Sequence, residues 1–337
     1  MGQLVFVEGI CGSGKSTTGQ LLTLHLQLNG YAAEWIYEHK LHHPLYVDKD
    51  IQLAREDSTE KFQSMFKDSL LNWRLMVERL ESSDEVKIFD GAFFQMSVGT
   101  MLLMNIDLEE IKAFVADVCK IIAKLNPTII YLGQDNIQQA LHSMLVERGS
   151  EFSEFIFSRI FDSPFGKFHN LPGEEGLAKF FIHYCQLIES IMVDLASKPE
   201  LNLSLVHLDK SALSWLEINR QLSDVFALPP MPNYFLSPAG VSTFAGDYQN
   251  PSNGDILTIE SDSLGLYLTG GINTRLLVLQ KDFSVTIPSE YLFSGMCIEC
   301  RFENSSINAP IMKLTGDLPG LNEIWVKKLK LEVGCGS

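Results

Sequence analysis

The sequence is poor in basic residues, which argues against nucleic acid as a partner. It contains 26 lysines and arginines against 42 aspartates and glutamates, so its formal net charge is −16. A surface of this sign repels the anionic phosphate backbone of DNA or RNA. We therefore expect no nucleic-acid partner, and an anionic substrate would need a local basic pocket.

Long apolar segments and paired cysteines are also lacking. The most apolar long run, residues 93–106, contains several polar residues and is too short to span a bilayer. The six cysteines follow no disulfide framework. Cys297 and Cys300 lie three residues apart on a predicted strand and so face opposite sides of it, without a second pair to complete a zinc site. With no recognisable signal peptide, these absences predict a soluble cytoplasmic protein that has no membrane partner.

Residues 1–228 alternate between short apolar runs and segments of helical periodicity. The chain has 337 residues, more than one domain usually contains, so two domains are expected. Five strands are predicted, at residues 4–7, 32–37, 86–89, 128–132 and 203–208. Helices are predicted at residues 15–29, 59–82, 107–125, 176–197 and 211–226, with a further helix capped by Asp135. Strands separated by helices predict an α/β fold, in which a doubly wound parallel sheet of about five strands binds ligands at the strands' C-terminal ends.

The pattern changes after residue 228. Residues 229–235 contain three prolines and predict a stiff linker. In residues 236–333, short β-forming runs alternate with turn signals such as Asn253-Gly254. Strands are predicted at residues 256–259, 265–269, 274–279, 283–287, 297–302, 311–314 and 324–331. We expect a smaller antiparallel all-β domain here, either a barrel or a sandwich.

One motif carries the chemistry of the first domain. Residues 9–16 read Gly-Ile-Cys-Gly-Ser-Gly-Lys-Ser, which matches G-x-x-x-x-G-K-[ST] in full, between a predicted strand and a predicted helix. Its glycines let successive amides turn inward around phosphate oxygens, and the helix adds the positive end of its dipole. Lys15 would bridge the β- and γ-phosphates of ATP, and the Ser16 hydroxyl would ligate Mg²⁺. The predicted nucleotide-binding residues are Gly9, Cys11, Gly12, Ser13, Gly14, Lys15, Ser16 and Thr17.

Residues 6–17 resemble the opening of thymidylate kinases and deoxynucleoside kinases, which place an acidic residue, here Glu8, before the first loop glycine. Tyr131-Leu132 followed by Asp135, and later Arg148-Gly149, is similar to the approach of thymidylate kinases to their lid. The resemblance covers residues 1–228. It implies an ATP- and Mg²⁺-dependent kinase.

The same resemblance points to two carboxylates at strand ends. Glu38 follows the second strand, where deoxynucleoside kinases place the carboxylate that accepts the proton of the substrate hydroxyl; the alternative is a solvated charge. Asp90 ends the third strand, where it could hold Mg²⁺ through water or act as a base. These families have an arginine at the next position, but this chain has Gly91. The arginine that usually contacts the acceptor is therefore missing, and the acceptor need not be a nucleoside.

Other candidate residues lie near these positions. Residues 146–175 match no clear element and are where a lid would lie. Arg148 is the first candidate in this segment to stabilise the charge on the transferred phosphoryl group, and Arg159 and Lys167 are weaker candidates. Phe93 and Phe94 could stack on a flat acceptor, although such phenylalanines more often belong to the core. The Gln95 amide could recognise the same acceptor by hydrogen bonding. The histidines and lysine after Glu38 favour a surface loop over a metal site, although one could contact the acceptor: His39, Lys40, His42 and His43.

The sequence thus predicts a kinase that transfers the γ-phosphoryl group to a small molecule. A nucleoside or nucleotide is the first acceptor class, and another alcohol, such as an antibiotic or a sugar, is the second. Two alternatives remain, a nucleotide-dependent switch protein with slow hydrolysis and a degenerate ATP-binding kinase homologue; no Asn-Lys-x-Asp stretch supports guanine specificity. The β domain is similar to the lipocalin-like barrels appended to some serine-hydrolase-type enzymes, and its role in recognition, shielding or homodimer formation is open.

Overall fold

The structure, a computed structural model, describes residues 2–38, 43–45, 59–230 and 245–254, together with the strands of the second half of the chain. The chain divides into two compact units, residues 1–231 and residues 232–337. Most of the predicted linker, from residue 231 to residue 235, lies outside the described residues. None of the helices in the described part of the chain is long and apolar enough to span a bilayer.

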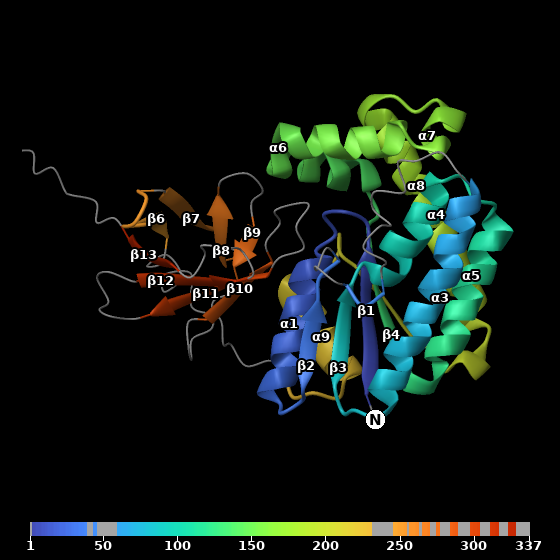
Figure 1. Ribbon diagram of the computed structural model, residues 1–337, viewed down its shortest axis with the longest axis horizontal. Helices are drawn as coiled ribbons and strands as arrows, with labels where there is room; N and C mark the ends of the chain where they lie inside the picture. The colour runs from blue at the N-terminus through green and yellow to red at the C-terminus, as the bar shows by residue number, and fades with distance from the viewer. Residues whose placement is uncertain are drawn as a thin grey trace, which may run out of the picture. The chain divides into compact units, whose positions relative to one another are not determined.

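The first unit is built on a five-stranded parallel sheet (Figure 1). Its strands are β1 (Gln3–Gly9), β2 (Ala33–Ile36), β3 (Val86–Asp90), β4 (Thr128–Gly133) and β5 (Ser204–Asp209), in the order β2-β3-β1-β4-β5. Every residue of β4 is buried, and so is β1 after its first residue. This burial explains why the central strands are continuous apolar runs, because helices cover both faces of the sheet.

Different helices cover the two faces. On one face, α1 (Lys15–Leu28) and α9 (Trp215–Val225) pack on the sheet through a buried cluster that includes Leu22 and Leu222. On the other face, Phe6 of β1 contacts Trp73 of α3 (Thr59–Glu81), with ring centroids 5.7 Å apart. The remaining helices of this unit are α4 (Gly99–Leu103), α5 (Leu108–Ile122), α6 (Ile137–Phe161), α7 (Pro164–His169) and α8 (Gly173–Ala196).

The five strands of the predicted parallel sheet are confirmed, whereas the predicted helix cap was wrong and two helical segments were not predicted. The cap of α6 is Asn136, whose side chain accepts a hydrogen bond from the Gln139 amide, and not Asp135. Residues 146–175 are mainly helical, because α6 continues through a kink at Gly149 and is followed by α7. After β3, a turn at Gly91 leads into an unpredicted π-helix, η1 (Ala92–Val98).

The second unit is an antiparallel sheet of eight strands in the order β10-β11-β12-β13-β6-β7-β8-β9. The strands are β6 (Gly246–Gln249), β7 (Ile256–Asp262), β8 (Gly265–Thr269), β9 (Thr274–Leu276), β10 (Ser284–Pro288), β11 (Cys297–Glu303), β12 (Ile311–Gly316) and β13 (Glu323–Lys327). Parts of the strands predicted at residues 274–279, 283–287 and 324–331 lie outside the described residues. The barrel or sandwich closure and the lipocalin-like character remain predictions.

We expect a fragment of residues 1–230 to fold without the second unit. Leu228, after α9, is 8% exposed and belongs to the same buried cluster as the sheet strands, so this fragment keeps the core intact. A fragment of residues 1–226 lacks Leu228 and should be less stable by about 2 kcal/mol, the contribution of one buried leucine. Urea unfolding of both fragments measures the difference, and aggregation of the longer fragment would contradict the proposed boundary.

Candidate active site

The loop between β1 and α1 depends on three glycines with positive φ. Gly9, Gly12 and Gly14 have φ values of 150°, 77° and 90°, which residues with a Cβ rarely adopt. A Cβ on Gly12 would also lie 3.0 Å from the Cβ of Met144 in α6. The loop therefore has a fixed, side-chain-poor surface at the C-terminal edge of the sheet.

The N-terminus of α1 is open to an anionic ligand. Gly14 caps this helix without a side-chain hydrogen bond, and the first turn contains no acidic residue. The Ser13 hydroxyl is buried and has no hydrogen-bond partner among the described residues. First-turn amides need an acceptor, and the helix dipole favours a negative one. The donors at this end of α1 thus fit phosphate oxygens.

Lys15 places a buried positive charge beside this loop. Its side chain is 6% exposed, and its Nζ donates a hydrogen bond to the Ile10 carbonyl at 3.2 Å. Burial by itself lowers the pKa of Lys15, but the negative charges of Glu38 and Asp90 outweigh burial and raise that pKa above its ordinary value. Lys15 is therefore an ammonium ion at neutral pH.

Glu38 and Lys15 meet in front of Gly91. A Cβ on Gly91 would lie 2.7 Å from Glu38 Oε2 and 3.2 Å from Lys15 Cε. Gln95 Nε2 donates a hydrogen bond to the same Glu38 oxygen at 2.5 Å. The residue that replaces the expected arginine thus leaves the space in which a carboxylate, an ammonium and an amide converge.

Asp90 completes this group from the end of β3. It is fully buried and lies opposite Val7 of β1 in the parallel register. Its negative charge raises the pKa of Lys15. Ser16, in the first turn of α1, is partly buried. A carboxylate at a strand end and a hydroxyl beside a phosphate loop are oxygen donors, which suit Mg²⁺.

Glu8, the residue before the loop, makes contacts that its position in the sequence did not reveal. Its carboxylate is fully buried and accepts hydrogen bonds from the Phe93 amide at 2.7 Å and the Gln95 amide at 3.1 Å. The side chains of Phe93 and Phe94 are 1% and 0% exposed, so both belong to the core and present no face to an acceptor. In this segment, the side chain of Gln95 reaches Glu38.

The charges of the two candidate arginines of α6 affect the pKa of a loop residue. Burial raises the pKa of the Cys11 thiol, and the positive charges of Lys15, Arg148 and Arg159 act against this rise. The Arg148 guanidinium also lies over the Phe152 ring, 4.8 Å from its centroid. Both arginines are partly buried, whereas Lys167 in α7 is exposed.

The histidines after Glu38 give no metal site in the part that the structure describes. His43 is buried, its Nδ1 accepts a hydrogen bond from the Leu45 amide at 3.2 Å, and its ring meets Phe89 edge-on. His39, Lys40 and His42 lie outside the described residues. Among the residues with described side chains, no three His, Cys, Asp or Glu residues are grouped to hold a metal ion.

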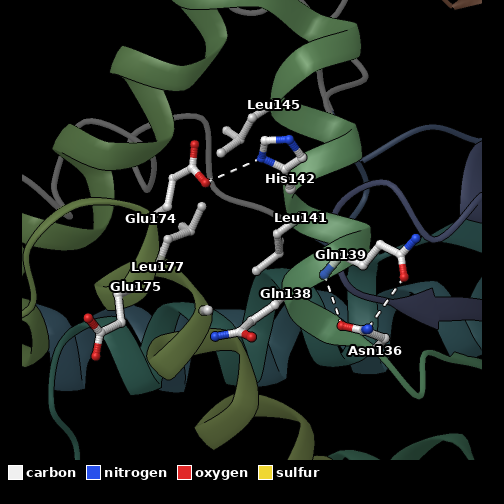
Figure 2. A pocket seen from close by; sticks show the side chains of 10 residues that line it. Asn136, Gln138, Gln139, Leu141, His142, Leu145, Glu174, Glu175 and Leu177 are labelled. Carbon is white, nitrogen blue, oxygen red and sulfur yellow. Dashed lines mark hydrogen bonds and ion pairs between the residues drawn. The ribbon is translucent and has the colours of Figure 1, made fainter.

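A separate hollow of about 480 Å³ lies between the first halves of α6 and α8 (Figure 2). Leu141, Leu145 and Leu177 contribute its apolar lining. On its polar side, His142 Nδ1 lies 3.4 Å from Glu174 Oε2. None of the predicted site residues lines this hollow, so it is not part of the phosphate-loop site.

Comparisons with known proteins do not show a family for this chain. No protein-family model matches the sequence, and no curated protein matches it. Among solved structures, the chain is similar to a deoxyadenosine kinase from M. mycoides with bound dATP, with 17% identity and a TM-score of 0.36. The likeness covers 66% of this chain and 99% of that chain. At this TM-score the likeness carries no argument, so the functional conclusions depend on the geometry of the site.

The structure gives Gly91 a role that can be tested by adding a single methyl group. Gly91→Ala should lower stability by about 1–2 kcal/mol, because its φ of 62° is left-handed. Gly30→Ala is the matched control, since its φ is 84° and nothing lies within 4 Å of an added Cβ. Thermal unfolding of both variants should give similar losses, but only Gly91→Ala should disturb ligand binding, because only there does the Cβ meet Glu38 and Lys15. Equal ligand binding in the two variants would contradict this role.

Proposed function

We propose that this protein is an ATP- and Mg²⁺-dependent kinase that transfers the γ-phosphoryl group to a small hydroxyl-bearing molecule. The observation that carries the proposal is the convergence of Lys15, Glu38 and Asp90 at the tip of a phosphate-binding loop. A buried ammonium beside open helix amides is suited to terminal phosphates, and a carboxylate beside it is suited to a hydroxyl.

Each residue has a task in this scheme. The loop amides and the start of α1 hold the phosphates, and Lys15 neutralises charge on the β- and γ-phosphates. Ser16 and Asp90 would hold Mg²⁺, which supplies further charge neutralisation to the phosphates. Glu38 orients the acceptor hydroxyl and receives its proton. Arg148 stabilises charge that spreads over the transferred oxygens.

The charge of the site favours a neutral acceptor over a phosphorylated one. Glu38 and Asp90 contribute two carboxylates beside the ammonium of Lys15, and Gly91 stands where an arginine was expected next to Asp90. A second phosphate group near these carboxylates would be repelled. Nucleosides are therefore the first acceptors to test, followed by other alcohols such as sugars and antibiotics, with nucleotides as the contrasting class.

The direct test is ADP formation by the full chain with MgATP and a panel of nucleosides, nucleotides and other alcohols. We expect stimulation by at least one neutral alcohol and a new phosphate ester in the product. Tight MgATP binding without ADP formation for any acceptor would instead favour the degenerate kinase homologue. The presence of Gly91 in place of the expected arginine supports that alternative. Slow ADP formation that no acceptor changes would favour the switch protein.

A further inference from the structure

Glu8 is a fully buried carboxylate that joins two segments far apart in the sequence. It ends the run of apolar residues in β1, directly before the phosphate loop, and its side chain is 0% exposed. Its Oε1 accepts the Phe93 amide and its Oε2 accepts the Gln95 amide, across 85 and 87 residues. Burying a carboxylate is costly unless hydrogen bonds satisfy it, so these contacts hold the start of η1 against β1.

The segment that Glu8 holds is irregular. Gly91 precedes η1 in a left-handed conformation and supplies no side-chain cap. Its amide bonds to the Val7 carbonyl at 2.9 Å, so the turn and η1 are both attached to the last residues of β1. Short π-helical segments are uncommon and need compensating contacts. Glu8 supplies the side-chain acceptor that this helix start otherwise lacks.

The same segment ends in the contact with Glu38. Gln95 is the residue whose amide N–H reaches Glu8 and whose side chain donates to Glu38 Oε2. A shift of the η1 backbone would therefore move the side-chain amide away from Glu38. The hydrogen bonds form one path, from the strand that carries the phosphate loop, through Gln95, to the carboxylate that faces Lys15.

We propose that Glu8 is a positioning residue, which fixes η1 to the phosphate-loop strand so that Gln95 holds Glu38 in place. The inference rests on the proposed function for its catalytic consequence, but the structural coupling exists whatever the reaction. It explains why a carboxylate stands at position 8: both of its oxygens accept from amides, which a neutral side-chain amide cannot reproduce. Burial raises the pKa of Glu8 to about 8, while the amides of Phe93 and Gln95 and the charge of Lys15 oppose the rise.

The coupling is tested without any turnover by hydrogen–deuterium exchange. Glu8→Gln keeps the shape of the side chain but places an NH₂ group against one of the two amides. Exchange at residues 93–95 should become about tenfold faster, because one of the two amides loses its hydrogen-bond acceptor. Glu85→Gln, an exposed carboxylate before β3, is the matched control and should leave this exchange unchanged. Unchanged exchange in Glu8→Gln would overturn the coupling.

The consequence for catalysis needs a separate measurement. Glu8→Gln should lower kcat about tenfold while the Kd for MgATP stays within about twofold, since positioning acts on transfer and not on phosphate binding. Gln95→Ala should lower kcat similarly, and adding Glu8→Gln to it should cost little more, because both act through the same contact. Additive losses, or a loss of MgATP affinity equal to the loss of kcat, would overturn the positioning role.

Two outcomes separate this inference from the proposed function. If no acceptor supports turnover in the wild-type protein, the proposed function fails while faster exchange in Glu8→Gln still upholds the coupling. If turnover exists but Glu8→Gln exchanges faster with unchanged kcat, the positioning role fails and the kinase stands. Should Glu8→Gln not fold, Glu8→Asp keeps the carboxyl group and shortens the side chain by one methylene, so it should give an intermediate change in exchange at the same amides.

Discussion

Replacing Lys15 with alanine is expected to weaken MgATP binding at least about 100-fold, because a buried ammonium that faces phosphates contributes a charge-assisted interaction. The substitution also leaves Glu38 and Asp90 without the positive charge that lies beside both. These carboxylates would then repel the incoming phosphates as well as each other. Isothermal titration with MgATP measures the affinity, and ADP formation should fall below detection.

A control must separate the loss of this charge from a general loss of stability. Lys87 is suitable, because it is a partly buried lysine of β3 that pairs with Glu34 at 2.6 Å and Glu85 at 3.1 Å, away from the loop. Lys87→Ala should lower the melting temperature but leave MgATP affinity unchanged. If Lys15→Ala bound MgATP as the wild-type protein does, the phosphate loop would have no part in the mechanism.

The strands of the parallel sheet could be predicted because burial on both faces leaves a simple pattern. β1 contains the apolar run of residues 4–7 and β4 that of residues 129–132, and each strand ends in a glycine at the C-terminal edge of the sheet. The strand β6 was missed because its sequence, Gly-Asp-Tyr-Gln, has neither an apolar run nor β-branched residues. Asn136 and Asp135 are both good capping residues, so composition could not decide between them.

The π-helix after β3 could not be predicted, because its cause is not local. The apolar residues of 93–106 suit any buried element, and the hydrogen bonds that set its start come from Glu8, 85 residues earlier. In the same way, the kink in α6 at Gly149 (φ 82°) is compatible with a loop or a helix until tertiary contacts are known. The local sequence pattern indicated no clear element there.

The resemblance to deoxynucleoside kinases pointed to Glu38 and Asp90, at strand ends where ligands commonly bind parallel sheets. Their tasks remain proposals. From the sequence, Gly91 could be interpreted only as a missing arginine. The structure adds that a side chain at this position would collide with Glu38. The sequence around position 91 could not reveal this collision, because Glu38 is distant in the sequence.

Glu38→Gln is expected to lower the rate of phosphoryl transfer by about 100-fold or more, because a side-chain base contributes on the order of 10²–10⁴ to such reactions. The structure should be retained, since the carbonyl oxygen of the new side chain can still accept the Gln95 amide. Asp90 also remains as a second carboxylate that raises the pKa of Lys15. The Kd for MgATP should therefore change little, and single-turnover kinetics with a saturating acceptor isolates the chemical step.

Glu34→Gln is the matched control, because Glu34 lies on β2, four residues before Glu38, and its carboxylate pairs with Lys87 instead of facing Lys15. It should leave both transfer and MgATP affinity unchanged. Equal rates for Glu38→Gln and wild type would exclude Glu38 as the base and leave Asp90 as the remaining carboxylate beside Lys15. A parallel loss of MgATP affinity in Glu38→Gln would instead place Glu38 in nucleotide binding, because an effect on transfer alone is what distinguishes a base from a residue that shapes the phosphate site.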